Sequence, residues 1–440
     1  LSCSIPYPAS PDLYPAPRIP PPAMLTRLFR QSDIPREYRA NFLHLYLDIG
    51  WYGILSGSAI NFLAIYAARL GASALQIGMI GAASAVVNLL IAIPAGRWLA
   101  KRNTGLAVFW SSVFYRLGYA LWIPLPWLFD AQGQIWALIV LTFLMAVPLT
   151  PLGVGFNALF AEAVPSDYRA HVAGLRNVVL SVAFMASSLV SGRILESVPF
   201  PTGYQIVFGI GFFGAAMSSL HLFYIRPLKK DRAPLPPDPL PVPANEAASP
   251  RGLASSLRLD ILRGPFRNVL LVLLFFHLTH YIATPIYPLY NVNVLHLNDD
   301  NIGIGTALFY FTVLIGSMGL KRIVRRIGHK RVTGWGMLGM ALYPFLLAFS
   351  HEVWHFYIVS LLGGFTWGLV GGAYANYLLE KIPDHDRPAH LAWYTIALNA
   401  AVLVSSFLGP AIANLVGLGA ALIFFAVMRM LAGYTILRWG

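Results

Sequence analysis

The chain has 440 residues, of which 57% are hydrophobic and only 11% are charged, and its mean hydropathy is +0.63. A soluble domain of this length does not need so much apolar surface, so the composition excludes a soluble protein and indicates a multi-pass membrane protein. The net charge of +13 is compatible with nucleic-acid binding. However, the basic residues gather at every second connection between apolar stretches, which is the pattern that sets orientation in a membrane.

Apolar stretches follow one another along the chain, and each is long enough for one helical crossing of about 20 residues. They are separated by short polar breaks or by breaks marked with Gly and Pro. We therefore predict an all-α integral membrane protein with twelve transmembrane helices. The predicted segments are 41–69, 75–99, 105–128, 134–161, 171–195, 203–226, 267–295, 301–320, 331–349, 353–379, 389–414 and 417–437.

The basic residues predict the orientation of these segments. Of the 31 Lys and Arg residues, 26 fall on one side of the predicted arrangement, Arg176 among them, and the alternate loops contain almost none. Lys and Arg are retained on the cytoplasmic side. We therefore expect both termini to be cytoplasmic and the protein to lie in the cell membrane, which is the inner membrane if the source is bacterial.

Two stretches of the chain are unsuited to crossing a membrane. Residues 1–40 form a Pro-rich and basic N-terminal segment. We expect residues 1–23 to be disordered or untranslated, because the chain starts with Leu and Met24 follows a run of prolines. Residues 227–262 form a Pro-rich linker between an N-terminal bundle, 41–226, and a C-terminal bundle, 263–440. The single cysteine, Cys3, excludes a disulfide framework.

The two bundles share a sequence pattern. Sliding one half over the other by 218 residues aligns an E-x-x-P-x-x-x-R motif and, without a gap, a Ser-Ser pair. Such a match indicates a duplicated six-helix unit, and internal repeats of this kind place a transport site at their interface. The aligned pairs are Gly153 and Gly371, Glu162 and Glu380, Pro165 and Pro383, Arg169 and Arg387, Ser187 and Ser405, and Ser188 and Ser406.

Two loops carry a resemblance to a known family. The stretch VPSDYRAHVAGLRN at 164–177 and the stretch LGASALQIGMIGAASAVVNLLIAIPAGRWLAKR at 70–102 resemble connections of the major facilitator superfamily of secondary transporters. The first copy of the family's loop motif departs from the pattern at Ala100, where an Asp is usual. The second copy, RRIGHKR at 325–331, keeps the Gly but has Arg325 in place of an acid. The resemblance implies two pseudo-symmetric six-helix bundles and transport by alternating access.

A carboxylate in the first segment, Asp48, is the first candidate for function. A charge at bilayer depth costs about 2.5 kcal/mol or more, so it usually faces a cavity or a partner. His44 lies one helical turn earlier, on the same helix face. A carboxylate beside an imidazole in a low-dielectric cavity is suited to proton coupling.

Arg116 in the third segment lies at a depth similar to that of Asp48, so the two side chains could pair. Neither residue has a charged counterpart in the other half. Two interpretations stay open: a structural ion pair in which each charge makes the other tolerable, and a proton or substrate site gated by the pair.

Arg429 in the last segment is a further charge without a visible partner in the sequence. It is interpreted as a structural residue, as a side chain that snorkels to the membrane surface, or as a site for an anion.

Acidic and basic residues recur at the predicted cytoplasmic ends of helices. Glu162 and Glu380 end their helices at the negative end of the helix dipole, where an acid needs a nearby cation. Arg169 and Arg387, or the basic loops after the second and eighth segments, are the expected partners. These residues are candidates for a cytoplasmic gate, with a static loop contact as the alternative.

The seventh segment is polar in its outer half and is interrupted by two prolines. Discontinuous helices of this kind free backbone groups near the site of a carrier. Two histidines three residues apart, with no third ligand nearby, are weak support for a metal. We therefore predict no metal and no cofactor, and we assign His277, His280, Tyr281 and Tyr287 to the substrate cavity.

The family resemblance also implies that helices one, four, seven and ten line the central cavity. Single aromatic residues are equally typical of a membrane interface. The further cavity candidates on this basis are Trp51, Tyr52, Asn61, Thr150, Asn157, Trp367, Tyr374 and Asn376.

These observations predict a secondary active transporter that moves a small organic solute by alternating access, with optional proton coupling and with export preferred because aromatic residues dominate the candidate cavity. The alternative is a non-transporting membrane sensor or assembly partner on the same scaffold. An enzyme is disfavoured, because no hydrolase, zinc-protease or phosphate-loop motif is found. The expected partners are the lipid bilayer, a small-molecule substrate and protons, with no nucleic acid, and the expected state is a monomer.

Overall fold

The first crossing is one continuous helical stretch in the computed structural model, which describes residues 36–228, 258–383 and 386–440. It consists of α2 (Arg36–Leu55), a π-helical turn η2 (Ser56–Ile60) and α3 (Asn61–Arg69). The predictions for residues 1–23 and for most of the 227–262 linker lie outside the described residues.

The rest of the N-half follows as antiparallel helices with short connections. The helices are α4 (Ala74–Ala100), α5 (Thr104–Ala120) with the short α6 (Leu125–Leu128), α7 (Ala131–Ala163), α8 (Ser166–Ser197) and α9 (Thr202–Tyr224). Side chains cap several of these helices: Ser73 forms a capping box with Gln76, and Asn103 and Asp130 accept hydrogen bonds from first-turn amides. The polar breaks in the sequence therefore coincide with the points where one helix ends and the next begins.

The C-half begins with a 3₁₀ turn, η4 (Leu259–Arg263), and an interrupted crossing made of α11 (Phe266–Tyr281), α12 (Ile286–Leu289) and a π-helical turn η5 (Tyr290–Val294). The interruption falls at Pro285, because proline supplies no backbone N–H to the preceding turn. The predicted break in the seventh segment is therefore confirmed.

The remaining helices are α13 (Asp299–Ala348), α14 (Val353–Glu380), α15 (Arg387–Val416) and α16 (Leu418–Trp439). α13 contains two predicted segments, and Gly328 breaks it with a φ of +79°. The helical turns continue up to this glycine, so the connection predicted at 321–330 is wrong in extent. Only the single left-handed glycine separates the two crossings.

Ten of the described helices are long and apolar enough to span a membrane. This set counts α13 once, although Gly328 divides it, and it omits α5, which has 17 residues. Large apolar side chains such as Leu90, Trp127 and Leu415 are exposed on the outside. The all-α transmembrane fold class is therefore confirmed.

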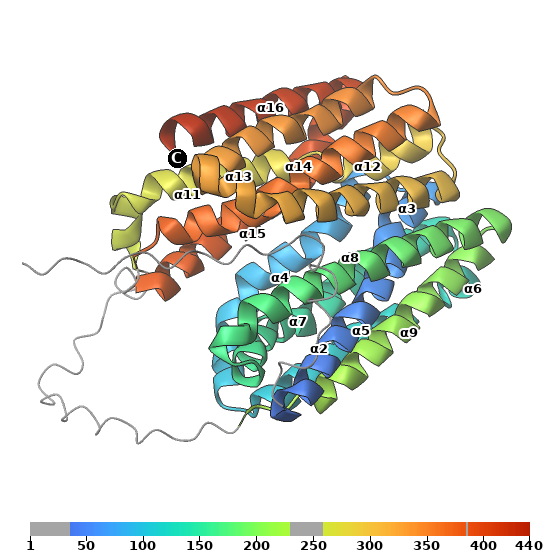
Figure 1. Ribbon diagram of the computed structural model, residues 1–440. Helices are drawn as coiled ribbons and strands as arrows, with labels where there is room; N and C mark the ends of the chain where they lie inside the picture. The colour runs from blue at the N-terminus through green and yellow to red at the C-terminus, as the bar shows by residue number, and fades with distance from the viewer. Residues whose placement is uncertain (1–35, 229–257, 384–385) are drawn as a thin grey trace, which may run out of the picture. The chain divides into compact units, whose positions relative to one another are not determined.

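The two halves form two groups of helices, coloured blue to green and yellow to red in Figure 1. α8 packs against α13, and α4 packs against α15. Small residues make both contacts close: a Cβ on Gly303 would lie 2.8 Å from the Ser188 carbonyl oxygen, and one on Gly78 would lie 2.0 Å from the Ser406 carbonyl oxygen. The two serines are aligned by the 218-residue repeat, so equivalent helices of the two halves make equivalent contacts.

Candidate functional site

Two cavities lie beside the interrupted crossing of α11, α12 and η5. The first, called here the central cavity, has a volume of about 410 Å³, and the second has a volume of about 430 Å³. Thr284 and Pro288 contribute to the walls of both. The proline break therefore places backbone and side-chain polar groups between the two cavities.

The walls of the central cavity are largely aromatic. Five of the 19 residues that line it are Phe or Tyr residues from α13, α14 and α12, and Trp367 is a sixth aromatic residue. The imidazole of His280 stacks on the Trp367 indole, with 4.8 Å between ring centroids and 2° between planes. The wall is thus suited to a flat apolar body.

The structure places five of the predicted cavity residues at these cavities. Asn61, His280, Tyr287 and Trp367 line the central cavity, and Tyr281 lines the second. The seven others are not among the lining residues of either cavity: Trp51, Tyr52, Thr150, Asn157, His277, Tyr374 and Asn376.

Most of those seven side chains have other partners. Trp51 packs edge-on against Phe213, and the Tyr52 ring lies 6.0 Å from the Arg116 guanidinium carbon. His277 Nε2 shares a hydrogen bond with Tyr394 Oη at 2.8 Å. These residues were predicted from their helix alone, and the rotation of each helix decides which face meets a cavity.

The polar residues of α7 and α14 differ in environment. The Thr150 hydroxyl donates to Asn88 Oδ1 at 2.7 Å, and Asn88 Nδ2 donates to Asn399 Oδ1 at 3.3 Å. This chain connects α7 and α4 to α15 across the two halves. Asn157 and Asn376 are exposed.

Among the described residues that line the central cavity, Arg429 is the one with a formal charge. It lies midway along α16 and is only 2% exposed. The snorkelling interpretation is therefore wrong, because the guanidinium stays inside the helical bundle rather than reaching a surface.

The guanidinium of Arg429 donates to oxygen atoms that are all uncharged. Nη1 donates to the Met340 carbonyl at 3.1 Å, and Nη2 donates to the His280 carbonyl at 2.9 Å and to Tyr287 Oη at 3.3 Å. Nε and Nη2 also reach the Thr279 carbonyl at 3.4 Å. No carboxylate of the described chain forms an ion pair with it.

These carbonyl groups are available because a proline and a helix end remove their usual backbone donors. Met340 lies four residues before Pro344, which has no N–H to donate to it. Thr279 and His280 lie in the last turn of α11, where carbonyls lack intrahelical donors. Arg429 therefore joins the end of α11 to the proline site inside α13.

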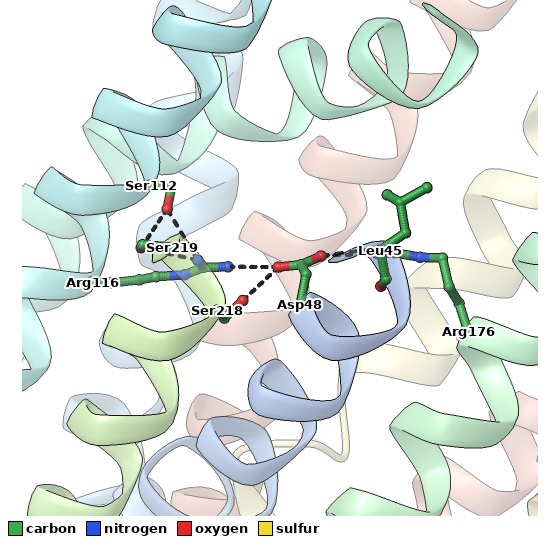
Figure 2. A network of polar contacts seen from close by, with 7 residues as sticks. All are labelled: Leu45, Asp48, Ser112, Arg116, Arg176, Ser218 and Ser219. Atoms are coloured by element: carbon green, nitrogen blue, oxygen red, sulfur yellow. Dashed lines mark hydrogen bonds and ion pairs between the residues drawn. The ribbon is translucent and has the colours of Figure 1, made fainter. Parts of the chain in front are cut away.

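Asp48 forms a second buried network, in the N-half (Figure 2). Its Oδ1 lies 3.8 Å from Arg116 Nη2 and accepts a 2.5 Å hydrogen bond from the Ser218 hydroxyl. Its Oδ2 lies 3.3 Å from Arg176 Nη2. Asp48, Arg116 and Arg176 are 3%, 5% and 8% exposed.

The two arginines of this network have further partners. Arg116 Nη1 donates to the hydroxyls of Ser112 and Ser219, each at 3.0 Å, and Arg176 Nη1 donates to the Leu45 carbonyl at 2.8 Å. The network therefore joins α2, α5, α8 and α9 and contains two cations for one anion.

Arg176 was missed as a partner, because the sequence pattern assigned it to the basic cytoplasmic side. Its position inside α8, ten residues after the helix start, was the available signal. No contact between His44 and Asp48 is among the described contacts. The His44 ring instead shares a 3.1 Å contact with His221 Nδ1 and stacks on Tyr224, since packing against α9 selects its neighbours.

The ends of the helices that carry Arg69 and Asp299, called here the distal end, are joined by a polar cluster. Arg69 Nη2 lies 3.0 Å from Asp299 Oδ1 and donates to the Leu297 carbonyl at 2.6 Å. Tyr204 donates to Asp299 Oδ2 at 2.8 Å. Residues of opposite charge lie at the end of the first predicted segment and just before the eighth, on the same predicted side, but this contact was not predicted.

The four gate candidates lie at the opposite, proximal end. Glu162 accepts a 3.4 Å hydrogen bond from Thr104, and Arg169 donates to the carbonyls of Val164 and Ala161. Glu380 meets His329 at 2.6 Å, so the loop after the eighth segment supplies its partner. Arg387 is exposed. No ion pair between Glu162 and Arg169 is among the described contacts.

The fold and its cavities define a multi-pass membrane protein of two helical bundles with polar and aromatic residues enclosed between them. The model of the Major Facilitator Superfamily matches residues 49–299 and 269–439. The chain belongs to the Major Facilitator Superfamily, a family of membrane transporters.

Individual relatives are more distant. The chain is 22% identical over 285 residues to the cis,cis-muconate transport protein of Acinetobacter baylyi, a match that covers 64% of this chain and 67% of that protein. It is 27% identical over 154 residues to the staphyloferrin B transporter of Staphylococcus aureus, covering 34% and 37% of the two chains. The solved structure of a D-xylose-proton symporter superposes with a TM-score of 0.68 at 16% identity, covering 91% and 97%.

Proposed function

We propose that this chain is a secondary active transporter that moves a small organic solute through the central cavity by alternating access. The observation that carries the proposal is the joining of the two halves at the distal end beside enclosed cavities. Relatives named for muconate and for staphyloferrin B transport support a small organic substrate. The basic residues at the proximal ends of the described helices support a cytoplasmic proximal end.

In this proposal the distal cluster is the outer gate. Arg69, Asp299 and Tyr204 hold the outer ends of both halves together, and the close contact between Gly192 and Gly303 adds a packed interface. Opening to the outside requires these contacts to separate while the proximal ends approach. Exposed Asn157 and Asn376 in the proximal halves of α7 and α14 support access from the cytoplasm in this state.

Proton coupling through Asp48 and His44 stays a prediction. The geometry favours an ion-pair role for Asp48, because two guanidinium groups and a hydroxyl occupy its oxygens. The described partners of the His44 ring are His221 and Tyr224, both on α9. Export remains the preferred direction of transport, because aromatic residues line the cavity.

The decisive test is solute exchange in proteoliposomes that contain the full chain. Vesicles loaded with muconate should accumulate labelled muconate faster than protein-free vesicles, and an imposed pH gradient should change the rate only if protons are coupled. A protein that binds muconate but gives no exchange for it or for a panel of organic acids, sugars and nucleosides contradicts transport and favours the sensor alternative.

The outer gate has its own test, because the sequence contains a single cysteine, Cys3. In a Cys3→Ser background, Thr306→Cys places a thiol in the wall of the central cavity. Asp299→Asn should raise the rate at which an impermeant thiol reagent labels it from outside by several fold. Asp300→Asn is the matched control, since its partner Arg193 is exposed and 3.8 Å away. Equal rates in both variants contradict the gate.

A further inference from the structure

The charge in the wall of the central cavity has no carboxylate counterion among the described residues. The cavity is lined by Arg429 and by no Asp or Glu among its described lining residues. A buried cation is normally paired with an anion, because removing it from water is costly. The carbonyl groups at the end of α11 provide partial negative charge, but they do not neutralise the guanidinium.

The hydrogen bonds of Arg429 leave donor capacity toward the cavity. Nη1 carries two N–H groups, and its described acceptor is the Met340 carbonyl alone. Tyr287 Oη accepts from Arg429 Nη2, so its own hydroxyl hydrogen is free to donate elsewhere. Both groups belong to the cavity wall.

Two further polar groups of the wall lack partners. His280 Nδ1 and Asn291 Oδ1 are buried with no hydrogen-bond partner in the described chain. Buried polar atoms are nearly always paired in a complete structure. The unpaired atoms therefore mark a place where a polar ligand belongs, next to the stacked His280 and Trp367 rings.

We propose that the central cavity binds a small, flat organic carboxylate, with the carboxylate on Arg429 and Tyr287 and the apolar body against Trp367 and the cavity tyrosines. A carboxylate accepts from guanidinium and hydroxyl donors in short, charge-assisted hydrogen bonds. The anion supplies the charge that the wall lacks, and the volume of about 410 Å³ accommodates one such molecule. The biological use of this site rests on the proposed transport function, but binding itself does not.

The test is binding to the purified, full-length protein, measured as a shift in thermal midpoint, since a ligand of the folded state stabilises it by mass action. The probes are benzoate, cinnamate and terephthalate, each compared with its neutral amide. The carboxylates should raise the midpoint and the amides should not. Equal shifts for acid and amide, or no shift with any carboxylate, overturn the proposal.

Variants locate the site. Arg429→Gln should weaken carboxylate binding at least tenfold, and Tyr287→Phe should weaken it several fold. Arg438→Gln is the matched control, because Arg438 is an exposed arginine on the same helix, and it should bind as the native chain does. Undiminished carboxylate binding by folded Arg429→Gln overturns the assignment.

If Arg429→Gln fails to fold, Tyr287→Phe and Thr284→Val decide, since the first removes a hydroxyl from the cavity wall and the second replaces one with a methyl group. Carboxylate affinity unchanged in both variants then overturns the proposal. Proteoliposome exchange separates the two proposals. If the protein exchanges uncharged solutes but binds no carboxylate, transport is supported and this inference is refuted. Carboxylate binding with no exchange of any solute leaves the inference standing and transport refuted.

Discussion

The two halves of the molecule bury arginine side chains in opposite ways. In the N-half, Arg116 and Arg176 lie on either side of a carboxylate, Asp48, and none of these residues belongs to the wall of the two described cavities. In the C-half, Arg429 meets only uncharged oxygens and belongs to a cavity wall. A buried charge that is paired away from the cavities supports the fold, whereas a charge that meets only uncharged groups at a cavity is available to a ligand.

The largest effect should follow from removing the shared anion of the N-half. Asp48→Asn leaves two buried cations without a carboxylate, and breaking a buried ion pair costs about 3–5 kcal/mol. We expect a similar loss in the free energy of unfolding, measured by detergent-denaturant titration. Adding Arg116→Met should recover part of it.

Asp167→Asn, at an exposed position in the first turn of α8, is the control for the Asp48 substitution. A stable Asp48→Asn protein that loses only proton-driven flux, and still exchanges solute, would reverse the assignment and make Asp48 a coupling residue.

A smaller effect is expected from Arg429→Gln. The substitution leaves no unpaired charge behind, but it removes donors from the carbonyls of Thr279, His280 and Met340. Unsatisfied buried acceptors cost about 1–3 kcal/mol, and the glutamine amide satisfies one of them. Because no uncompensated charge stays buried in the protein, we expect the same titration to show a smaller loss than for Asp48→Asn. A larger loss would show that Arg429 is foremost a structural residue and would remove the contrast between the halves.

Ser218→Ala tests how tightly Asp48 is held. The Ser218 hydroxyl gives Asp48 Oδ1 its shortest contact, at 2.5 Å, and a hydrogen bond to a charged group contributes about 1.5–3 kcal/mol. Because both arginines remain, we expect a loss near the lower limit. Ser166→Ala, at an exposed position, serves as the comparison, and indistinguishable unfolding of the two variants would contradict a tightly held carboxylate.

The smallest effect is expected at Arg258, an exposed arginine outside the membrane-spanning helices. It is one cation between two carboxylates, whereas Asp48 is one carboxylate between two cations. Arg258 Nη2 lies 3.0 Å from Asp260 and 2.9 Å from Asp386, and its hydrogen bond lowers the pKa of Asp260. A lowered pKa in the folded state means that the contribution to stability is present at neutral pH and is lost as the pH falls through that pKa. The thermal midpoints of the native chain and Asp260→Asn should differ slightly at pH 7 and converge below pH 4. A difference that grows toward low pH would contradict the assignment.

The sequence predicted the fold well because each crossing is a local property. A run of apolar residues and its polar ends are read without knowledge of the rest of the chain. The break at Pro285 was readable for the same reason, since proline removes a backbone donor wherever it occurs.

The site was less predictable because it depends on how helices rotate against one another. The four-residue spacing put His44 and Asp48 on one face, yet α9 provides different partners for each: His221 for the first and Ser218 for the second. Arg176 was counted among the cytoplasmic basic residues that set membrane orientation, although its depth in α8 places it beside Asp48. Spacing shows which residues share a face, and only packing shows what lies opposite.

The position of each network along the chain has a consequence for the order in which the protein is synthesised and inserted. Ser218 and Ser219 lie in α9, the last helix of the N-half, and Arg429 lies in α16, the last described helix of the C-half. The buried charges of α2, α5 and α8 therefore acquire their hydroxyl partners before the linker emerges from the ribosome. The carbonyls of α11 and α13 meet the Arg429 guanidinium only after α16 has been synthesised, so the wall of the central cavity is completed later than the Asp48 network.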